Sequence, residues 1–186
     1  MLKLYGGALS RAAIVQLYLE ELGVPYESVT LDMPAGEHLQ PEYLAINPMG
    51  KVPAIVDGDF KLWESGAILL YLAEKYAQMP NSAEKRAEIF QWVVFSNSTL
   101  LRGLLTEEMR AKEMPQLLNP LNRTLSQQPF LLGDEFTVAD LAVGTGLLYV
   151  GMTVKLDWSA DYPAIAAYTQ SIASRPAFRK VMAGRG

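Results

Sequence analysis

The sequence of 186 residues predicts a small α/β module followed by an all-α module. Up to about residue 76, short β-like runs alternate with amphipathic helices. A polar linker, Gln-Met-Pro-Asn-Ser, follows at residues 78–82. Beyond this linker, the apolar residues recur at the three- and four-residue spacing of helices. We therefore expect two domains, over residues 1–77 and 83–186.

The first module predicts the element order β-α-β-(α)-β-β-α. Strands are expected where short apolar runs end in turn residues, and helices where apolar residues share one helical face. The expected strands span residues 2–5, 26–31, 52–57 and 60–62, and the expected helices span residues 10–22, 41–46 and 64–76. The opening β-α-β order implies a parallel strand pair with a right-handed crossover. Asp57-Gly58-Asp59 indicates a hairpin between the last two strands.

Four helical segments are expected in the second module. They span residues 84–113, a stretch that begins near Pro115 and Pro120 and runs towards 128, residues 137 to about 150, and residues 162–174. One helix start is strongly marked, because Thr137 and Asp140 have the spacing of a capping box, flanked by Phe136 and Leu141 as a hydrophobic staple. We interpret this pattern as a folding signal without a catalytic role.

Composition excludes several classes of function. Acidic residues outnumber basic residues by 20 to 16, whereas nucleic-acid binders usually carry a basic surplus. The chain has no cysteine, which excludes disulfide scaffolds, thiolate metal sites and cysteine nucleophiles. A single histidine, His38, disfavours multi-histidine metal sites, so no metal is expected. No signal peptide or apolar span is visible, so we expect a cytoplasmic protein with no membrane partner.

The segment 47–55, Asn-Pro-Met-Gly-Lys-Val-Pro-Ala-Ile, is the most informative. Pro53 lies at the start of an apolar strand, and an X-Pro bond at such a corner is a candidate for the cis form. The Val52 main chain could then pair with an extended peptide ligand, as an added strand does. The alternative is an ordinary trans proline that begins an edge strand.

Glu64 and Ser65 lie where the third helix of the first module is expected to begin. The free N–H groups of a helix N-terminus suit a ligand carboxylate, and the Glu64 carboxylate suits an ammonium. Together they would bind an α-amino acid terminus, although either residue could be a plain helix cap. Lys51 and His38 could hold a second carboxylate, the alternative being solvated surface side chains.

Ser10 and Arg11 lie between the first strand and the first helix. A serine at this position usually caps the helix. A hydroxyl or a guanidinium here could also stabilise a thiolate, because a donor aimed at sulfur lowers the thiol pKa from its usual value of about 8.5. Capping and catalysis both remain open for Ser10.

With these residues in place, the sequence resembles the cytosolic glutathione S-transferases over nearly its whole length. The matching segments are Leu4-Tyr5 with Ser10, residues 19–27 (Leu-Glu-Glu-Leu-Gly-Val-Pro-Tyr-Glu), residues 36–38 and 41–44, Asn47-Pro48-x-Gly50-Lys51-Val52-Pro53-Ala54, Glu64-Ser65-x-Ala67-Ile68-x-x-Tyr71-Leu72, Phe136-Thr137-x-Ala139-Asp140 and Arg175-Pro176-Ala177-Phe178. Within residues 36–54 the matching segments resemble the theta and phi types closely. The chain is short for the family and is similar to the compact bacterial members, nearest the cyanobacterial chi class. The resemblance implies a thioredoxin-like first domain, an all-α second domain and a homodimer.

The resemblance also implies a reaction and roles for the site residues. Glutathione would be the cosubstrate, and its thiolate would attack a small hydrophobic electrophile in a detoxification reaction. Val52, before a cis Pro53, would pair with the cysteinyl backbone. Glu64 and Ser65 would hold the γ-glutamyl end, and His38 with Lys51 the glycyl carboxylate. Either Ser10 or Arg11 would activate the thiol, since the loop at residues 6–11 is one residue shorter than a theta-type loop.

Two alternatives share the same expected fold. The chain could be a non-catalytic interaction module, or a glutathione-dependent lyase, dehalogenase or isomerase. The electrophile pocket is expected between the two modules, near Leu9 and the helix after the linker.

Overall fold

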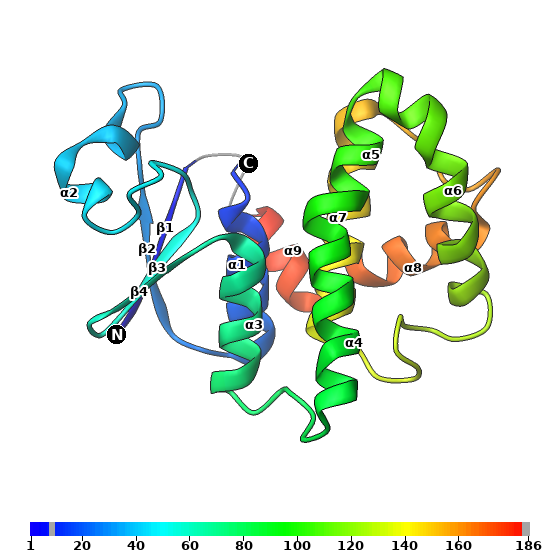
Figure 1. The fold of residues 1–186 in the computed structure, drawn as a ribbon, viewed down its shortest axis with the longest axis horizontal. Helices are drawn as coiled ribbons and strands as arrows, with labels where there is room; N and C mark the ends of the chain where they lie inside the picture. The colour runs from blue at the N-terminus through cyan, green and yellow to red at the C-terminus, as the bar shows by residue number, and fades with distance from the viewer. Residues whose placement is uncertain (8–9, 184–186) are drawn as a thin grey trace. The chain divides into compact units, whose positions relative to one another are not determined.

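The computed structural model describes residues 1–7 and 10–183 and contains two compact units. One unit comprises Met1–Ala77 together with the chain from Pro176 onwards, and the other comprises Gln78–Arg175. Each unit has its own fold (Figure 1).

The first unit is built on a sheet of four strands in the order β2-β1-β3-β4. The strands are β1 (Leu2–Gly6), β2 (Tyr26–Thr30), β3 (Ala54–Asp57) and β4 (Phe60–Trp63). The β1 and β2 strands are parallel, with Leu2 opposite Tyr26, as the β-α-β pattern predicts. The β3 strand is antiparallel to both β1 and β4. The predicted hairpin is also confirmed, since Asp57 pairs with Phe60 and Gly58 takes the positive φ of 63° between them.

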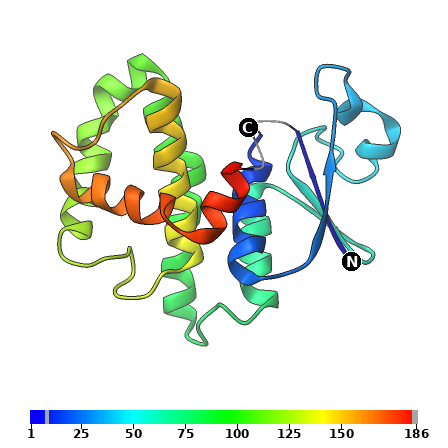
Figure 2. The same cartoon turned by 180° about the vertical axis from the view of Figure 1, so that it is seen from behind.

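Helices α1 (Ala12–Leu22) and α3 (Ser65–Lys75) lie side by side on one face of this sheet, as Figures 1 and 2 show from opposite sides. The short helices η1 (Glu37–Leu39) and α2 (Pro41–Leu44) lie on the other side. Buried apolar side chains of β1, β3, α1 and α3, among them Leu4, Leu19, Ile55 and Leu72, form the core. This core fixes where the ends of α1 and α3 lie.

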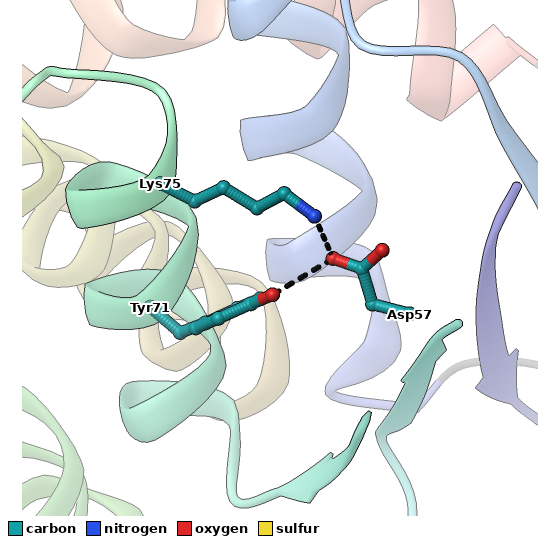
Figure 3. Close-up of polar contacts among 3 residues, drawn as sticks. All are labelled: Asp57, Tyr71 and Lys75. Atoms are coloured by element: carbon teal, nitrogen blue, oxygen red, sulfur yellow. Dashed lines mark hydrogen bonds and ion pairs between the residues drawn. The ribbon is translucent and has the colours of Figure 1, made fainter. Parts of the chain in front are cut away.

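The hairpin is fastened to α3 by a polar cluster of three side chains, Asp57, Tyr71 and Lys75 (Figure 3). The Tyr71 hydroxyl donates to Asp57 Oδ2 at 2.8 Å, and Lys75 Nζ donates to the same oxygen. The ring of Phe60 packs on the ring of Tyr71, with centroids 5.0 Å apart. The β3–β4 hairpin and the exposed side of α3 are thereby joined.

The last helix, α9 (Pro176–Ala183), was not expected from the periodicity and belongs to the first unit. It packs against α1, where Lys180 Nζ lies 2.6 Å from Glu20 Oε2. Val181 of this helix is buried. The chain therefore returns to the first unit after completing the second.

The second unit is helical, as predicted. Its helices are α4 (Ala83–Val94), η2 (Phe95–Leu100), α5 (Leu101–Leu105), α6 (Glu107–Leu125), α7 (Val138–Val154) and α8 (Pro163–Ala173). Leucine side chains of α6 and α7, including Leu118, Leu121 and Leu147, lie in one core with Ile165 of α8. Within the described part of the chain, no helix is both long enough and apolar enough to cross a membrane.

Two helix predictions in this unit are wrong. The segment 84–113 is not one helix, because η2 has π-helical hydrogen bonding and the extended backbone of Thr106, at ψ 144°, ends α5. Pro115 and Pro120 do not bracket a helix start but lie inside α6. A proline usually breaks a helix because it lacks an N–H. Here the burial of one apolar face outweighs that cost.

The capping box at the start of α7 is confirmed. Asp140 Oδ2 accepts from the N–H and the hydroxyl of Thr137 at 2.9 and 3.0 Å. Its Oδ1 accepts from Leu131 N–H at 2.8 Å and from the Tyr168 hydroxyl at 3.2 Å. Burial raises the pKa of this carboxyl, while these four donors oppose the rise. Asp140 thus also joins the α6–α7 loop to α8.

Candidate functional site

A cavity of about 190 Å³ opens in the first unit where three chain segments meet. It is lined by Arg11 at the start of α1, by the loop before β3 and by the N-terminus of α3. The lining residues are Arg11, Asn47, Lys51, Val52, Pro53, Glu64 and Ser65. Six of the eight residues singled out from the sequence therefore lie together, whereas Ser10 and His38 are not among those lining it.

The Val52–Pro53 peptide bond is cis, as predicted. No residue of the described ranges 1–7 and 10–183 donates to the C=O of Val52 or accepts from its N–H. Val52 is half-buried and lines the cavity directly before β3 begins at Ala54. Its main chain can thus pair with an extended ligand, in the manner of an added strand.

The N-terminus of α3 supplies the second group of contacts. Glu64 lies just before the helix with φ 71° and ψ 117°, and no side chain caps the first turn. A positive φ in a residue with a side chain costs about 1–3 kcal/mol, and such residues cluster at functional sites. Ser65 is 2% exposed and lines the same cavity. The uncapped N–H groups and the helix dipole favour a carboxylate at this point.

The Ser10 side chain bonds to the backbone just before and at the start of the first helix. Its Oγ accepts hydrogen bonds from the N–H groups of Gly7 and Ala12, both at 3.2 Å. The oxygen is therefore an acceptor for the protein, while the hydroxyl proton can still be donated to a ligand. Arg11, next in the chain, is exposed and lines the cavity. Leu9, expected beside the electrophile, lies outside the described residues.

His38 and Lys51 lie in different segments, and of the two only Lys51 lines the cavity. His38 lies in η1, and its Nδ1 is buried without a hydrogen-bond partner among the described residues. Lys51 is exposed and brings a positive charge to the cavity wall. Its carbonyl oxygen accepts from the Tyr43 hydroxyl at 2.5 Å and from Asn47 Nδ2 at 2.7 Å. The main chain of Lys51 is thus held by the protein, while its side chain is exposed.

Asn47 is a site residue to which the sequence analysis gave no role. The signal that could have found it is the turn sequence Asn-Pro-Met-Gly, since Asn side chains bond to the backbone two residues on. Asn47 Oδ1 accepts from Met49 N–H at 3.0 Å in this way. Its second bond, to Lys51, needs the folded loop and has no signal in the sequence.

The electrostatics of the cavity suit a bound peptide with charged ends. Burial raises the pKa of Tyr43 to about 12, so its hydroxyl remains a donor at neutral pH. Lys51 and Arg11 carry positive charge, and Glu64 carries negative charge. Within residues 1–7 and 10–183, no cluster of three or more His, Asp or Glu side chains could hold a metal ion.

Comparison with known proteins gives the same result for both units. Residues 1–74 match the family model described as glutathione S-transferase, N-terminal domain, and residues 83–185 match the C-terminal domain of that family. The chain is 33% identical to glutathione S-transferase F9 of Arabidopsis thaliana, with 98% of this chain and 97% of the relative covered. It is 35% identical to glutathione S-transferase GstB of Escherichia coli K12, with 90% of each covered.

A solved structure extends the likeness to three dimensions. The glutathione transferase URE2P6 of Phanerochaete chrysosporium, determined in complex with oxidized glutathione, is 31% identical and superposes with a TM-score of 0.86 over 99% of this chain and 96% of that chain. The thioredoxin-like sheet with its helices and the all-helical second unit are therefore both those expected from the resemblance. Fold, cavity and sequence identity over the whole length lead to one conclusion: the chain belongs to the cytosolic glutathione S-transferase family.

Proposed function

We propose that this glutathione S-transferase binds glutathione in the cavity and directs its thiolate at small hydrophobic electrophiles, a detoxification reaction. One observation supports the proposal. The unpaired main chain of Val52, the uncapped N-terminus of α3 and the basic residue Lys51 all line one cavity. These three features fit the middle and the two ends of an extended tripeptide.

Each end of glutathione has a proposed partner. The Val52 N–H and C=O pair with the cysteinyl backbone. The γ-glutamyl carboxylate accepts from the Ser65 hydroxyl and the first N–H groups of α3, and its ammonium lies against the Glu64 carboxylate. The glycyl carboxylate is held by Lys51, with His38 beside it. The cysteinyl sulfur then points towards the start of α1.

Ser10 is the first choice for activating the thiol, and Arg11 is the substitute. A hydrogen bond donated by the Ser10 hydroxyl to the sulfur lowers the thiol pKa, so that the thiol proton leaves to solvent and thiolate accumulates at neutral pH. The Arg11 guanidinium would act in the same way by its charge. The sulfur then forms a bond to the electrophilic carbon, and the leaving group departs with its electron pair. Positioning and thiolate stabilisation supply the rate.

Thiolate absorbance of bound glutathione tests this assignment. The wild type should be retained on immobilised glutathione and should show thiolate near neutral pH. In Ser10→Ala the pKa of the bound thiol should rise by about one unit, which corresponds to about 1.4 kcal/mol of lost stabilisation. If Ser10→Ala keeps its thiolate and Arg11→Ala loses it, the activating residue is Arg11.

The same measurements separate the alternatives. A protein that neither binds glutathione nor forms thiolate would be an interaction module, and the enzymatic proposal would fail. A protein that forms thiolate but conjugates no electrophile would favour the lyase, dehalogenase or isomerase alternative. We also propose that the protein is a cytoplasmic homodimer of the compact bacterial type, nearest the cyanobacterial chi class. This proposal rests on the sequence resemblance.

A further inference from the structure

We infer that Asn47 is a positioning residue that, together with Tyr43, aims the Val52 N–H into the cavity by holding the carbonyl of Lys51. The inference rests on the proposed function for its ligand, but the geometry that carries it belongs to the protein alone. Neither Asn47 nor Tyr43 was among the residues expected at the site.

The Asn47 side chain bonds to the backbone of two other residues in the loop before β3. It is 1% exposed. Its Oδ1 accepts from Met49 N–H at 3.0 Å, and its Nδ2 donates to the Lys51 carbonyl at 2.7 Å. The Asn47 carbonyl accepts from Gly50 N–H at 3.0 Å. Residues 47–51 are therefore held as one turn by a single buried amide and its own backbone.

Tyr43 supplies a second donor to the same carbonyl. Its hydroxyl lies 2.5 Å from the Lys51 oxygen, and the residue is 3% exposed. The ring packs against Tyr5 of β1, with centroids 5.9 Å apart, so the hydroxyl is anchored to the sheet. The two donors occupy both lone pairs of the Lys51 oxygen. The carbonyl is therefore fixed in direction by two separate buried residues.

The direction of this carbonyl determines the direction of the next N–H. The peptide unit from Lys51 to Val52 is planar, and in a trans peptide the C=O and the N–H point in opposite directions. Among the described residues, the cis bond lies one position later, at Val52–Pro53. Because Asn47 and Tyr43 hold the Lys51 oxygen on the protein side, the Val52 N–H is turned to the opposite side, where Val52 lines the cavity.

The loop is also closely packed, which leaves it little freedom to adjust. Gly50 has a positive φ of 59°, and a Cβ at this position would lie 3.0 Å from Leu39 Cδ2 and 3.3 Å from the His38 carbonyl oxygen. The turn therefore packs directly against η1. Loss of the Asn47 bond would leave the Lys51 oxygen with Tyr43 alone, and the Lys51–Val52 peptide could then rotate more widely about its two flanking bonds.

The experiment compares Asn47→Asp and Tyr43→Phe with the wild type. Asp keeps an acceptor for Met49 N–H but places an oxygen opposite the Lys51 oxygen, and Phe keeps the ring while removing the other donor. Each variant should weaken glutathione binding about three- to tenfold, the factor expected for one lost hydrogen bond. The kcat at saturating glutathione should stay within about twofold, because the sulfur is not contacted.

Asn122→Ala is the matched control. Asn122 Oδ1 accepts from the N–H groups of Ala164 and Ile165 at 3.0 and 3.1 Å, so it is also a structural asparagine, but in the other unit. This variant should lose stability and keep the wild-type dissociation constant for glutathione. Equal weakening of binding in Asn47→Asp and Asn122→Ala would mean that global stability is responsible, and the inference would be overturned.

A second readout does not depend on glutathione. NMR relaxation of the free protein gives the order parameter of the Val52 backbone amide. This order parameter should be lower in Asn47→Asp than in the wild type and unchanged in Asn122→Ala. Failure of the wild type to bind glutathione would refute the proposed function alone, and the amide measurement would still decide the role of Asn47. An unchanged Val52 amide in both Asn47→Asp and Tyr43→Phe would overturn the inference.

Discussion

The main chain and the side chain of Lys51 have different roles. Its carbonyl accepts from Tyr43 and Asn47, whereas its side chain is exposed and the residue lines the cavity. The carbonyl bonds are made by the main chain, so a change of side chain leaves them in place. The side chain can therefore be tested separately from the loop that carries it.

Lys51→Met should raise the KM for glutathione about five- to tenfold, since a charge-assisted hydrogen bond contributes roughly 1.5–3 kcal/mol before solvent screening. Binding to the wild type should also weaken as salt is added, and the variant should show less of this dependence. Steady-state kinetics at two ionic strengths would check both effects. Lys61→Gln is the control, because Lys61 bonds to the Ala45 carbonyl at 3.0 Å and is not among the residues that line the cavity. An unchanged KM in Lys51→Met would remove Lys51 from the proposed site.

At the scale of elements, the cluster of Asp57, Tyr71 and Lys75 joins the β3–β4 hairpin to α3 (Figure 3). The hydrogen bond from Lys75 lowers the pKa of the Asp57 carboxyl, and the bond from Tyr71 lowers it further. The hydrogen bond with Asp57 in turn raises the pKa of Lys75, because it stabilises the charged ammonium. The pair therefore contributes most when both groups are charged.

The pH dependence of this contribution has a definite sign. Because the Asp57 pKa is lowered by folding, the stabilisation is present above the unfolded value of about 3.9 and is lost as the pH falls through the folded value. Because the Lys75 pKa is raised, the stabilisation is also lost as the pH rises above about 10.4 and through the folded value. The contribution should be constant between these limits.

Asp57→Asn should lower the free energy of unfolding at pH 7 by about 0.5–1 kcal/mol, the range for partly exposed pairs. Denaturant unfolding at several pH values would measure the difference between the variant and the wild type. The difference should shrink as the pH falls below the unfolded value of about 3.9 and through the lowered folded pKa of Asp57, because the wild-type carboxyl then becomes protonated. A difference that stays constant down to pH 2 would contradict the assignment of the effect to the Asp57 charge. Asp59→Asn, in the same turn, is the control.

The capping box is the second element-scale feature. Asp140 is fully buried and accepts from donors on the loop before α7, on Thr137 and on Tyr168 of α8. Asp140→Ala would leave these donors unpaired in the interior and should lower the free energy of unfolding by about 2–4 kcal/mol. Thr137→Ala, which removes the helix cap and one of the four donors to Asp140, should cost about 1 kcal/mol.

Thermal unfolding followed by circular dichroism would measure both variants. Asp134→Ala is the matched control, because Asp134 is exposed in the same loop and should change stability by less than about 0.5 kcal/mol. If Asp140→Ala were no less stable than Asp134→Ala, the buried network would not contribute to the fold.

At the scale of the whole molecule, the chain crosses from the first unit to the second and then returns. The C-terminal helix α9 packs on α1, and its Lys180 pairs with Glu20 across 160 residues of sequence. The contacts of α9 therefore support the unit that carries the cavity, although its sequence continues from the helical unit.

Val181→Asp should lower the melting temperature and weaken glutathione binding, because Val181 is 4% exposed and an unpaired charge would be buried against the first unit. Met182→Asp is the control, since the neighbouring Met182 is 36% exposed and should tolerate the charge. Differential scanning calorimetry with and without glutathione would compare the two. Equal melting temperatures would show that α9 does not stabilise the first unit.

Local patterns in the sequence predicted most of the fold. The β-α-β start, the Asp57-Gly58-Asp59 hairpin and the Thr137 capping box depend on residues close in sequence, and all three are confirmed. The prediction of one helix over residues 84–113 was wrong, because the π-helical turn η2 has no local signal and because the extended backbone of Thr106 ends α5. The predicted helix start at Pro115 and Pro120 was also wrong. Both prolines carry a local helix-breaking signal, but the burial of α6 outweighs it.

The sequence by itself determined the chemistry that is open to this protein. With no cysteine, the chain has no thiol of its own, so the reactive sulfur of the proposed reaction belongs to the cosubstrate. The tertiary structure alone decided that α9 returns to the first unit and that Asn47 and Tyr43 bond to one carbonyl. The reason is physical, because periodicity and turn chemistry are local properties, whereas these contacts exist only after the segments have packed together.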